Sequence, residues 1–83
     1  MAGAVHTQAY RDVLSTLICL RTEAELSQAD LAIRIGRPPS FVGKYELGER
    51  RLDVVELLII LRELDTDFET FWSRTNAILR SKL

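Results

Sequence analysis

The 83-residue chain is poor in the residue types from which catalytic and metal centres are built. It contains one cysteine, Cys19, and one histidine, His6, which excludes an intrachain disulfide and is too few for the usual structural zinc sites. His6 lies in a patternless N-terminal segment. Cys19 lies beside the apolar stripe of a predicted helix, so we expect a buried structural thiol. No glycine-rich phosphate loop occurs. We therefore expect no enzymatic activity, no metal and no cofactor.

Long apolar runs are also missing. None approaches the roughly 18 residues that a membrane span needs, and the N-terminus lacks a basic region followed by an apolar stretch, so we expect neither a membrane segment nor a signal peptide. Since 47% of the residues are hydrophobic, the chain can form one small domain with a limited core. The expected location is the cytoplasm of a bacterium, or of a cell carrying phage or plasmid genes.

No charge of one sign dominates the chain, whose net charge is −1. The distribution is uneven, because residues 34–51 hold five cations and two anions, a local charge of +3, and the rest carries −4. Salt screening restricts electric fields to about 10 Å, so a basic surface on an acidic body still attracts phosphate. The alternative is an ordinary solvated charged face. The five cations are Arg34, Arg37, Lys44, Arg50 and Arg51.

The clearest pattern in the chain spans residues 27–48. Ser27 followed by Asp30 is a capping-box pattern, which predicts the start of a helix. Gly36 suits the left-handed conformation that ends a helix, and the proline pair after it suits the start of another. Gly48 closes that second helix. The segment therefore predicts two short helices joined by a tight turn.

Apolar residues at helical spacing predict three more helices. They cover about residues 8–24, 54–64 and 67–81, the last within a C-terminal segment 66–82 that Thr66 is expected to cap. Residues 1–7 have no pattern and are expected to form a flexible arm. The predicted fold is a single all-α domain of five helices with its core within residues 8–64.

The segment 27–48 resembles the helix-turn-helix of the lambda-repressor/Cro-like, or xenobiotic-response-element, family. The resemblance extends to Arg21 before it and to residues 52–64 after it. It implies that the second and third helices read the major groove of DNA, and that Arg21 pairs with Glu46 to fix one helix against another. The matching pattern is Leu-Ser-Gln-x-x-Leu-Ala, then Gly, Ser-x-Val and Tyr-Glu-x-Gly-Glu-Arg.

Positions around the predicted third helix indicate roles for individual side chains. Arg37, Ser40 and Lys44 are expected to face base edges, whereas Gln28, Arg50 and Arg51 are expected at phosphates. Phe41 either touches a thymine methyl group or packs inside the domain. The predicted DNA-binding set is Gln28, Arg37, Pro39, Ser40, Phe41, Gly43, Lys44, Arg50 and Arg51.

Three positions depart from the family pattern. Pro39 stands where a glutamine often bonds adenine, and proline has no donor for a base edge. Gly43 stands where a polar side chain often enters the groove, and a close backbone approach is one reason for a glycine inside a helix. Arg37 replaces a usual apolar residue. We therefore expect specificity to depend more on DNA shape than on many direct base contacts.

Apolar residues beyond the needs of the core predict a dimer interface. Val55 and Ile59 lie on a helical face that the family usually leaves polar, and the last helix is rich in aromatic residues. The alternative is that the last helix packs on its own subunit. The core face of the fourth helix is predicted as Val54, Leu57, Leu58, Leu61 and Leu64. The predicted interface comprises Val55, Ile59 and some of Phe68, Phe71, Trp72 and Ile78.

These features predict a repressor-like regulator that binds double-stranded DNA, reading a palindromic operator as a symmetric homodimer. A small repressor, a restriction–modification controller and an antitoxin with a toxin partner all fit. The alternative is a protein-interaction module in which the helix-turn-helix is only a scaffold. The basic cluster favours the regulator, whereas the acidic total and the departures at Arg37, Pro39 and Gly43 keep the alternative open.

Overall fold

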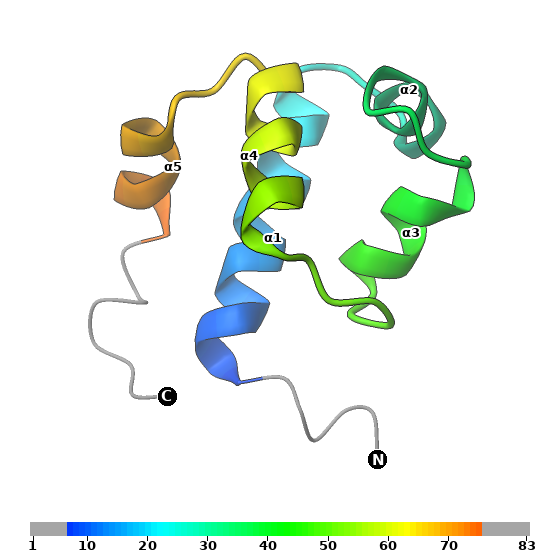
Figure 1. Cartoon of the computed structure of the whole chain (residues 1–83). Coiled ribbons are helices and arrows are strands. Elements are labelled where there is room, and N and C mark those ends of the chain that lie inside the picture. Colours follow the sequence, from blue (N-terminus) through cyan, green and yellow to red (C-terminus); the bar gives the residue numbers. More distant parts are fainter. Residues whose placement is uncertain (1–6, 76–83) are drawn as a thin grey trace.

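The computed structural model describes residues 7–75, which form five α-helices and no strand (Figure 1). This confirms the predicted all-α, five-helix class. Expectations about residues 1–6 and about Ile78 lie outside the described residues. Within residues 7–75 no helix is both long and apolar enough to cross a membrane. The helices are α1 (Gln8–Glu23), α2 (Gln28–Arg34), α3 (Ser40–Glu46), α4 (Val54–Glu63) and α5 (Phe68–Arg74).

Side-chain caps begin α2 and α4 where the sequence predicts them. The Ser27 hydroxyl accepts from the Asp30 amide at 3.0 Å, and the Asp30 carboxylate accepts from the Ser27 amide at 3.1 Å. Asp53 and Glu56 exchange the same two bonds at the start of α4. Such reciprocal bonds satisfy amide groups that the first helical turn leaves unpaired.

The last helix differs from its prediction at both ends. Asp67, not Thr66, caps α5, because its carboxylate accepts from the Thr70 amide at 2.8 Å. The Thr66 hydroxyl instead donates to the Leu64 carbonyl at 3.2 Å. The helix ends at Arg74, since Thr75 has φ −113° and ψ 39°, outside the helical region. It is thus shorter than the predicted span to residue 81, whose last residues lie outside the described part.

Four turns place the helices, and each uses a residue with positive φ. Gly36 ends the turn after α2 with φ 73°, and Gly48 follows α3 with φ 82°. Glu25 after α1 (φ 60°) and Asp65 after α4 (φ 55°) adopt the same left-handed conformation without being glycine. A side chain in this region costs about 1 kcal/mol.

The core lies where α1 to α4 converge, with one aromatic ring added from α5. Figure 1 shows α2 and α3 on one side of the α1–α4 pair and α5 on the other. Ala32 is fully buried, which allows the close approach of α2 and α3. The largest fully buried side chains are Tyr45, Leu17, Leu31, Ile60 and Val42.

The core face of α4 shares Leu57, Leu61 and Leu64 with the predicted one but includes Ile60 in place of Val54 and Leu58. Ile60, Leu61 and Leu64 are buried, whereas Val54 is 70% and Leu58 47% exposed. The sequence of α4 is almost continuously apolar, so several faces satisfy helical spacing equally well. The prediction that Val54 and Leu58 face the core was therefore wrong.

The single cysteine also differs from its prediction. Cys19 is a free thiol on the exposed side of α1. Leu17 and Leu20 on either side of it are buried in the core. The helix turns about 100° per residue, so a residue beside an apolar stripe can still face solvent.

Candidate nucleic-acid interface

The C-terminal end of α3 is fixed to α1 and α2 by one carboxylate. Glu46 accepts two hydrogen bonds from the Arg21 guanidinium, at 2.7 and 3.1 Å, and one from the Gln28 amide at 2.8 Å. Arg21 also donates to the Leu26 carbonyl at 2.9 Å. The side chains of Arg21 and Glu46 are only 12% and 5% exposed, and the hydrogen bond to Glu46 raises the pKa of Arg21. The structure thus brings together the two residues of the expected ion pair.

The inner side of α3 is anchored by Val42 and Tyr45, which are both fully buried. Burial raises the pKa of the Tyr45 hydroxyl, because the charged phenolate is disfavoured away from water. Within residues 7–75 this hydroxyl has no hydrogen-bond partner, so Tyr45 holds α3 through packing. The opposite side of α3 faces solvent.

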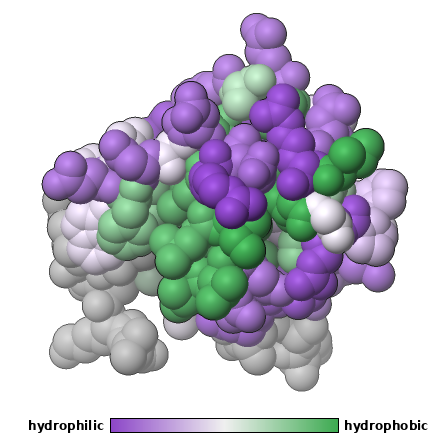
Figure 2. Space-filling model, turned by 45° about the horizontal axis from the view of Figure 1, so that its top comes forward, coloured by the Kyte–Doolittle hydropathy of each residue, from purple (hydrophilic) through white to green (hydrophobic). Residues whose placement is uncertain are grey.

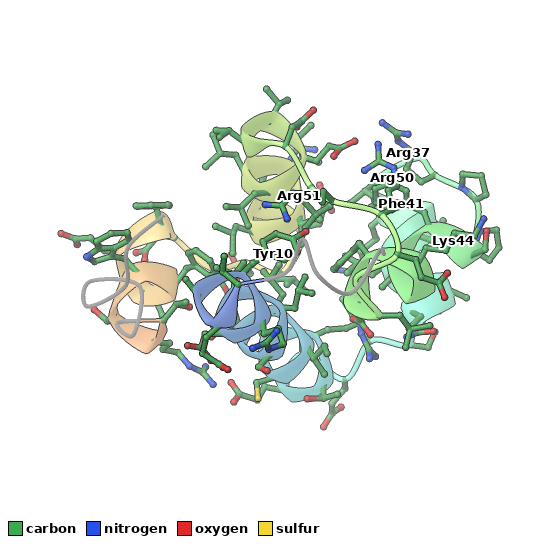
Figure 3. All side chains as sticks on the ribbon, turned by 90° about the horizontal axis from the view of Figure 1, so that it is seen from below. Tyr10, Arg37, Phe41, Lys44, Arg50 and Arg51 are labelled. Atoms are coloured by element: carbon green, nitrogen blue, oxygen red, sulfur yellow. The ribbon has the colours of Figure 1, made fainter. Side chains whose placement is uncertain are left out.

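The N-terminal end of α3 carries a second charged cluster (Figure 3). The Arg50 guanidinium donates to both oxygens of Glu56, at 2.9 and 2.7 Å, and Arg37 lies 3.4 Å from the same carboxylate. Both guanidiniums lie against the ring of Phe41, 4.8 and 5.0 Å from its centroid. We call Arg37, Arg50, Glu56 and Phe41 the Glu56 cluster.

Phe41 lies buried beneath the two arginines of this cluster. It is 6% exposed and makes an edge-on contact with Tyr45, with ring centroids 5.7 Å apart. Of the two expected roles, its burial favours packing, because the arginines cover the ring and leave little surface for a thymine methyl group. Phe41 thus supports the two guanidiniums from beneath.

Hydrogen bonds between the Glu56 carboxylate and its neighbours shift the pKa values of Glu56 and Arg50. Bonding to Arg50 first, and then to the Asp53 amide, lowers the pKa of Glu56, and bonding to Glu56 raises the pKa of Arg50. Both groups therefore remain charged at neutral pH.

The loop after α3 is tied to α1 by Arg51 and Tyr10. The Arg51 guanidinium stacks 4.2 Å from the centroid of the Tyr10 ring, and the Tyr10 hydroxyl accepts from the Leu52 amide at 3.0 Å. These contacts hold the loop against α1, and Figure 3 shows Arg51 beside Tyr10, apart from Phe41, Arg37 and Arg50.

The outer side of α3 carries Pro39, Ser40 and Lys44, which are all exposed. In the part of the chain that the structure describes, Lys44 makes no ion pair. Figure 3 shows Lys44 apart from Arg37 and Arg50, so cations lie at more than one place along α3. This spacing suits a ligand that presents several acceptor groups, as a DNA groove does.

Gly43 has a role within the protein that the sequence did not predict. A Cβ atom built there would lie 3.3 Å from the side-chain oxygen of Gln28. Gln28, which was expected at a phosphate, lies across this glycine and bonds Glu46. Gly43 thus leaves room for Gln28 between α2 and α3.

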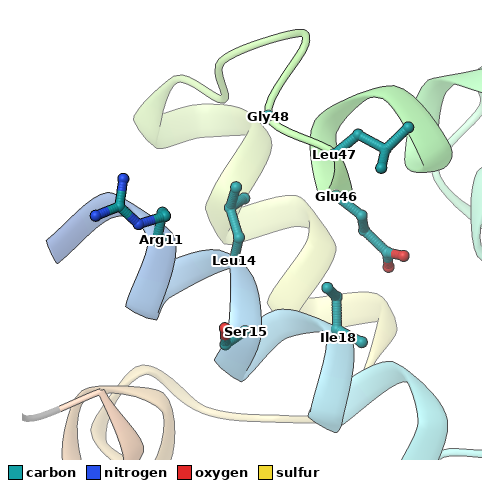
Figure 4. Close-up of a pocket in the computed structure, with 7 residues that line it drawn as sticks. All are labelled: Arg11, Leu14, Ser15, Ile18, Glu46, Leu47 and Gly48. Carbon is teal, nitrogen blue, oxygen red and sulfur yellow. The ribbon is translucent and has the colours of Figure 1, made fainter. Parts of the chain in front are cut away.

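A hollow of about 370 Å³ lies between α1 and the end of α3 (Figure 4). Its only carboxylate is Glu46, which already accepts from Arg21 and Gln28. The lining offers no histidine or cysteine that could act as a base or nucleophile. Residues 7–75 also contain no group of three metal-ligating side chains. The lining residues are Arg11, Leu14, Ser15, Ile18, Glu46, Leu47 and Gly48.

The expected dimer surface is only partly exposed. Phe71 is 2% exposed and belongs to the core of its own subunit, so its assignment to an interface was wrong. Arg74 of α5 also bonds Glu23 of α1 bidentately, at 2.8 and 2.7 Å, which docks α5 on its own chain. Ile59 is half-buried and lines a small hollow with Ile35 and Phe41 among others.

An apolar surface nevertheless remains on α4 and α5. Val54 and Val55 are 70% and 63% exposed, and Phe68 stacks on Trp72 with ring centroids 5.9 Å apart. Figure 2 shows a hydrophobic patch on the face that includes α4. We call this the α4–α5 surface; it comprises Val54, Val55, Leu58, Phe68 and Trp72.

Comparisons with known proteins agree with this geometry. A family model described as "Helix-turn-helix" matches residues 20–71. The solved structure of an "XRE-family like protein" from Pseudomonas syringae pv. tomato str. DC3000 is 38% identical, with a TM-score of 0.79. The match covers 94% of this chain and 98% of that one. No curated protein matches the chain.

Proposed function

The chain belongs to the helix-turn-helix family of the lambda-repressor and xenobiotic-response-element type, a family of DNA-binding regulators, and from this premise we propose that it is a sequence-specific, repressor-like regulator of transcription. The observation that supports this most is the setting of α3. Its inner side and C-terminal end are anchored by Tyr45 and Glu46, whereas its outer side and N-terminal end carry cations.

The proposed contacts divide into base readout and phosphate binding. Lys44, Ser40 and Arg37 read base edges, because they lie along or beside the outer side of α3. Arg50 and Arg51, in the loop after α3, bind phosphates. Gln28 reaches a phosphate only if it gives up part of its bonding to Glu46.

A selection experiment followed by salt titrations tests this division. A duplex pool with a randomised centre is enriched for bound sequences, and the selected and random duplexes are then compared. Lys44→Ala should weaken binding to the selected duplex by about tenfold and leave random duplex less affected. Arg51→Ala should weaken both alike and flatten the slope of log affinity against log salt by about one unit. Equal effects of both substitutions on both duplexes would contradict the division.

We further propose that two copies associate through the α4–α5 surface. A single helix-turn-helix covers half a site, and a two-fold dimer places two recognition helices about 34 Å apart, one turn of DNA. The aromatic pair Phe68 and Trp72 with exposed Leu58 offers the apolar centre that homodimer interfaces have.

Sedimentation tests the dimer. Leu58→Asp places a charge on the α4–α5 surface and should shift the chain toward monomer. The matched control is Ile33→Asp, since Ile33 is an exposed apolar residue of α2, 72% exposed, and should leave the dimer intact. Ile59 is a poor choice because its half-buried side chain also supports the fold. A wild type that stays monomeric at high micromolar concentration would contradict the interface.

The second candidate function is a protein-interaction module, such as an antitoxin that binds a toxin. The exposed α4–α5 surface favours it, because a different chain could cover the same residues. A monomeric wild type from which no duplex can be selected would favour this function over the first.

A further inference from the structure

One carboxylate holds two arginines that come from different loops around α3. Arg37 lies in the turn before α3, Arg50 in the loop after it, and Glu56 in the first turn of α4. The Arg37 and Arg50 side chains remain 47% and 39% exposed, whereas Glu56 is 13% exposed. The acid is thus recessed behind two cations that face solvent.

Only one of the hydrogen bonds that Glu56 accepts is needed to cap α4. One of its oxygens, Oε1, accepts from the Asp53 amide at 3.0 Å and completes the capping box. The other, Oε2, is bonded by arginines alone, at 2.7 Å to Arg50 and 3.4 Å to Arg37. A neutral glutamine could keep the capping bond, because glutamine serves at this position of a capping box.

The Phe41 ring restrains the same two guanidiniums from a second direction. The ring and the carboxylate together give each guanidinium a defined position, whereas arginines usually sample many rotamers in solution. At the same time the carboxylate cancels one of the two positive charges.

We propose that Glu56 determines specificity by restraining Arg37 and Arg50 and by competing for them with the phosphates of random DNA. This inference rests on the proposed DNA-binding function. Sequence-independent binding grows with the number of cations that neutralise phosphates. An internal anion therefore weakens contacts to random DNA, while a guanidinium held in place still bonds an acceptor at the matching position.

The test measures Glu56→Gln on a random-sequence duplex and on the duplex enriched by selection. The variant should bind the random duplex about threefold more tightly at low salt, with a slope of log affinity against log salt that is steeper by about 0.9. The ratio between selected and random duplex should fall. Circular dichroism and a thermal melt should show that the variant is folded.

Glu23→Gln is the matched control. Glu23 also bonds an arginine bidentately, at 2.7 and 2.8 Å to Arg74, but the pair joins α1 to α5. The substitution changes the net charge by the same amount and should leave both affinities and the salt slope unchanged. An equal effect of the two substitutions would overturn the proposal, because net charge alone would then explain it.

Two further variants close the test. In a chain that carries Arg37→Gln and Arg50→Gln, Glu56→Gln should have no additional effect, and a persisting effect would overturn the proposal. Arg50→Lys keeps the charge but cannot bond Glu56 bidentately, so it should also lower the ratio between selected and random duplex. Full discrimination in Arg50→Lys would contradict the proposal even if Glu56→Gln did not fold.

The outcomes separate this inference from the function on which it rests. If wild type binds no duplex at any salt concentration, the proposed function fails. If wild type binds and Glu56→Gln matches it in affinity, slope and discrimination, or binds random duplex more weakly, only the role of Glu56 fails.

Discussion

The two ends of α3 are both held by arginine and glutamate, but in opposite surroundings. At the C-terminal end the Arg21 and Glu46 side chains are 12% and 5% exposed and bond each other, Gln28 and a backbone carbonyl. At the N-terminal end Arg37 and Arg50 are 47% and 39% exposed above their shared carboxylate.

Because the two arginine–glutamate pairs differ in burial, breaking them has different energetic consequences. Breaking a buried pair leaves a charge without water or a partner, whereas an exposed pair exchanges its partner for water at little cost. The inner pair therefore contributes mainly to the position of α3. The outer arginines can exchange their carboxylate for another anion.

The largest effect on stability is expected at the inner pair. Glu46→Ala should lower the free energy of unfolding by about 3 kcal/mol, because Arg21 then stays buried without its carboxylate. Thermal and denaturant melts measure the loss. The Arg21→Ala/Glu46→Ala double variant should lose less than the two single losses added together, and additive losses would mean that the two side chains are not coupled.

A smaller change in stability, of opposite sign, is expected at Gly43 in the middle of α3. Gly43→Ala should raise the free energy of unfolding by less than about 1 kcal/mol, because alanine favours the helix but its Cβ presses on Gln28. In a Gln28→Ala background that contact is gone, so the gain from Gly43→Ala should be larger. A loss of stability in both backgrounds would show that another contact requires glycine.

The smallest change in stability is expected when acid protonates Glu56 in the Glu56 cluster. The folded-state pKa of Glu56 is lowered by Arg50, so its contribution is present above the unfolded pKa of about 4.3 and is lost as the pH falls below it. Arg50→Ala removes the main cause, so its melting temperature should fall slightly less than that of wild type between neutral pH and about pH 3. An identical fall in both proteins would show that this pair contributes nothing to stability.

The helix starts with capping boxes were predictable from the sequence because their signals are local. Ser27 with Asp30 and Asp53 with Glu56 lie three residues apart, so each pair identifies a helix start without knowledge of the fold. The burial of Ile60 in place of Val54 and Leu58 was not predictable, because the almost continuously apolar sequence of α4 fits several faces. The left-handed backbone at Glu25 likewise carries no sequence signal, since glycine is the usual residue there.

The charged cluster at the start of α3 was only half predictable. Arg37 and Arg50 stand out as cations around a recognition helix, but Glu56 had a sufficient explanation as a helix cap. Its bonds to Arg37 and Arg50 depend on the packing of the turn before α3, the loop after α3 and the start of α4. Short-range sequence spacing does not indicate how these three segments pack together. The burial of Phe41 follows from the same convergence, because two arginines from different loops cover its ring.

The exposed thiol of Cys19 allows the natural chain to be labelled with a spectroscopic probe. It is the only cysteine, so a nitroxide or fluorophore attached through a thioether marks one site on each chain without any substitution. In a symmetric pair of chains, two such labels define a single distance, and electron–electron dipolar spectroscopy can follow that distance as duplex is added. The same accessibility requires a reducing buffer during sedimentation, since air oxidation would join two chains covalently and imitate association.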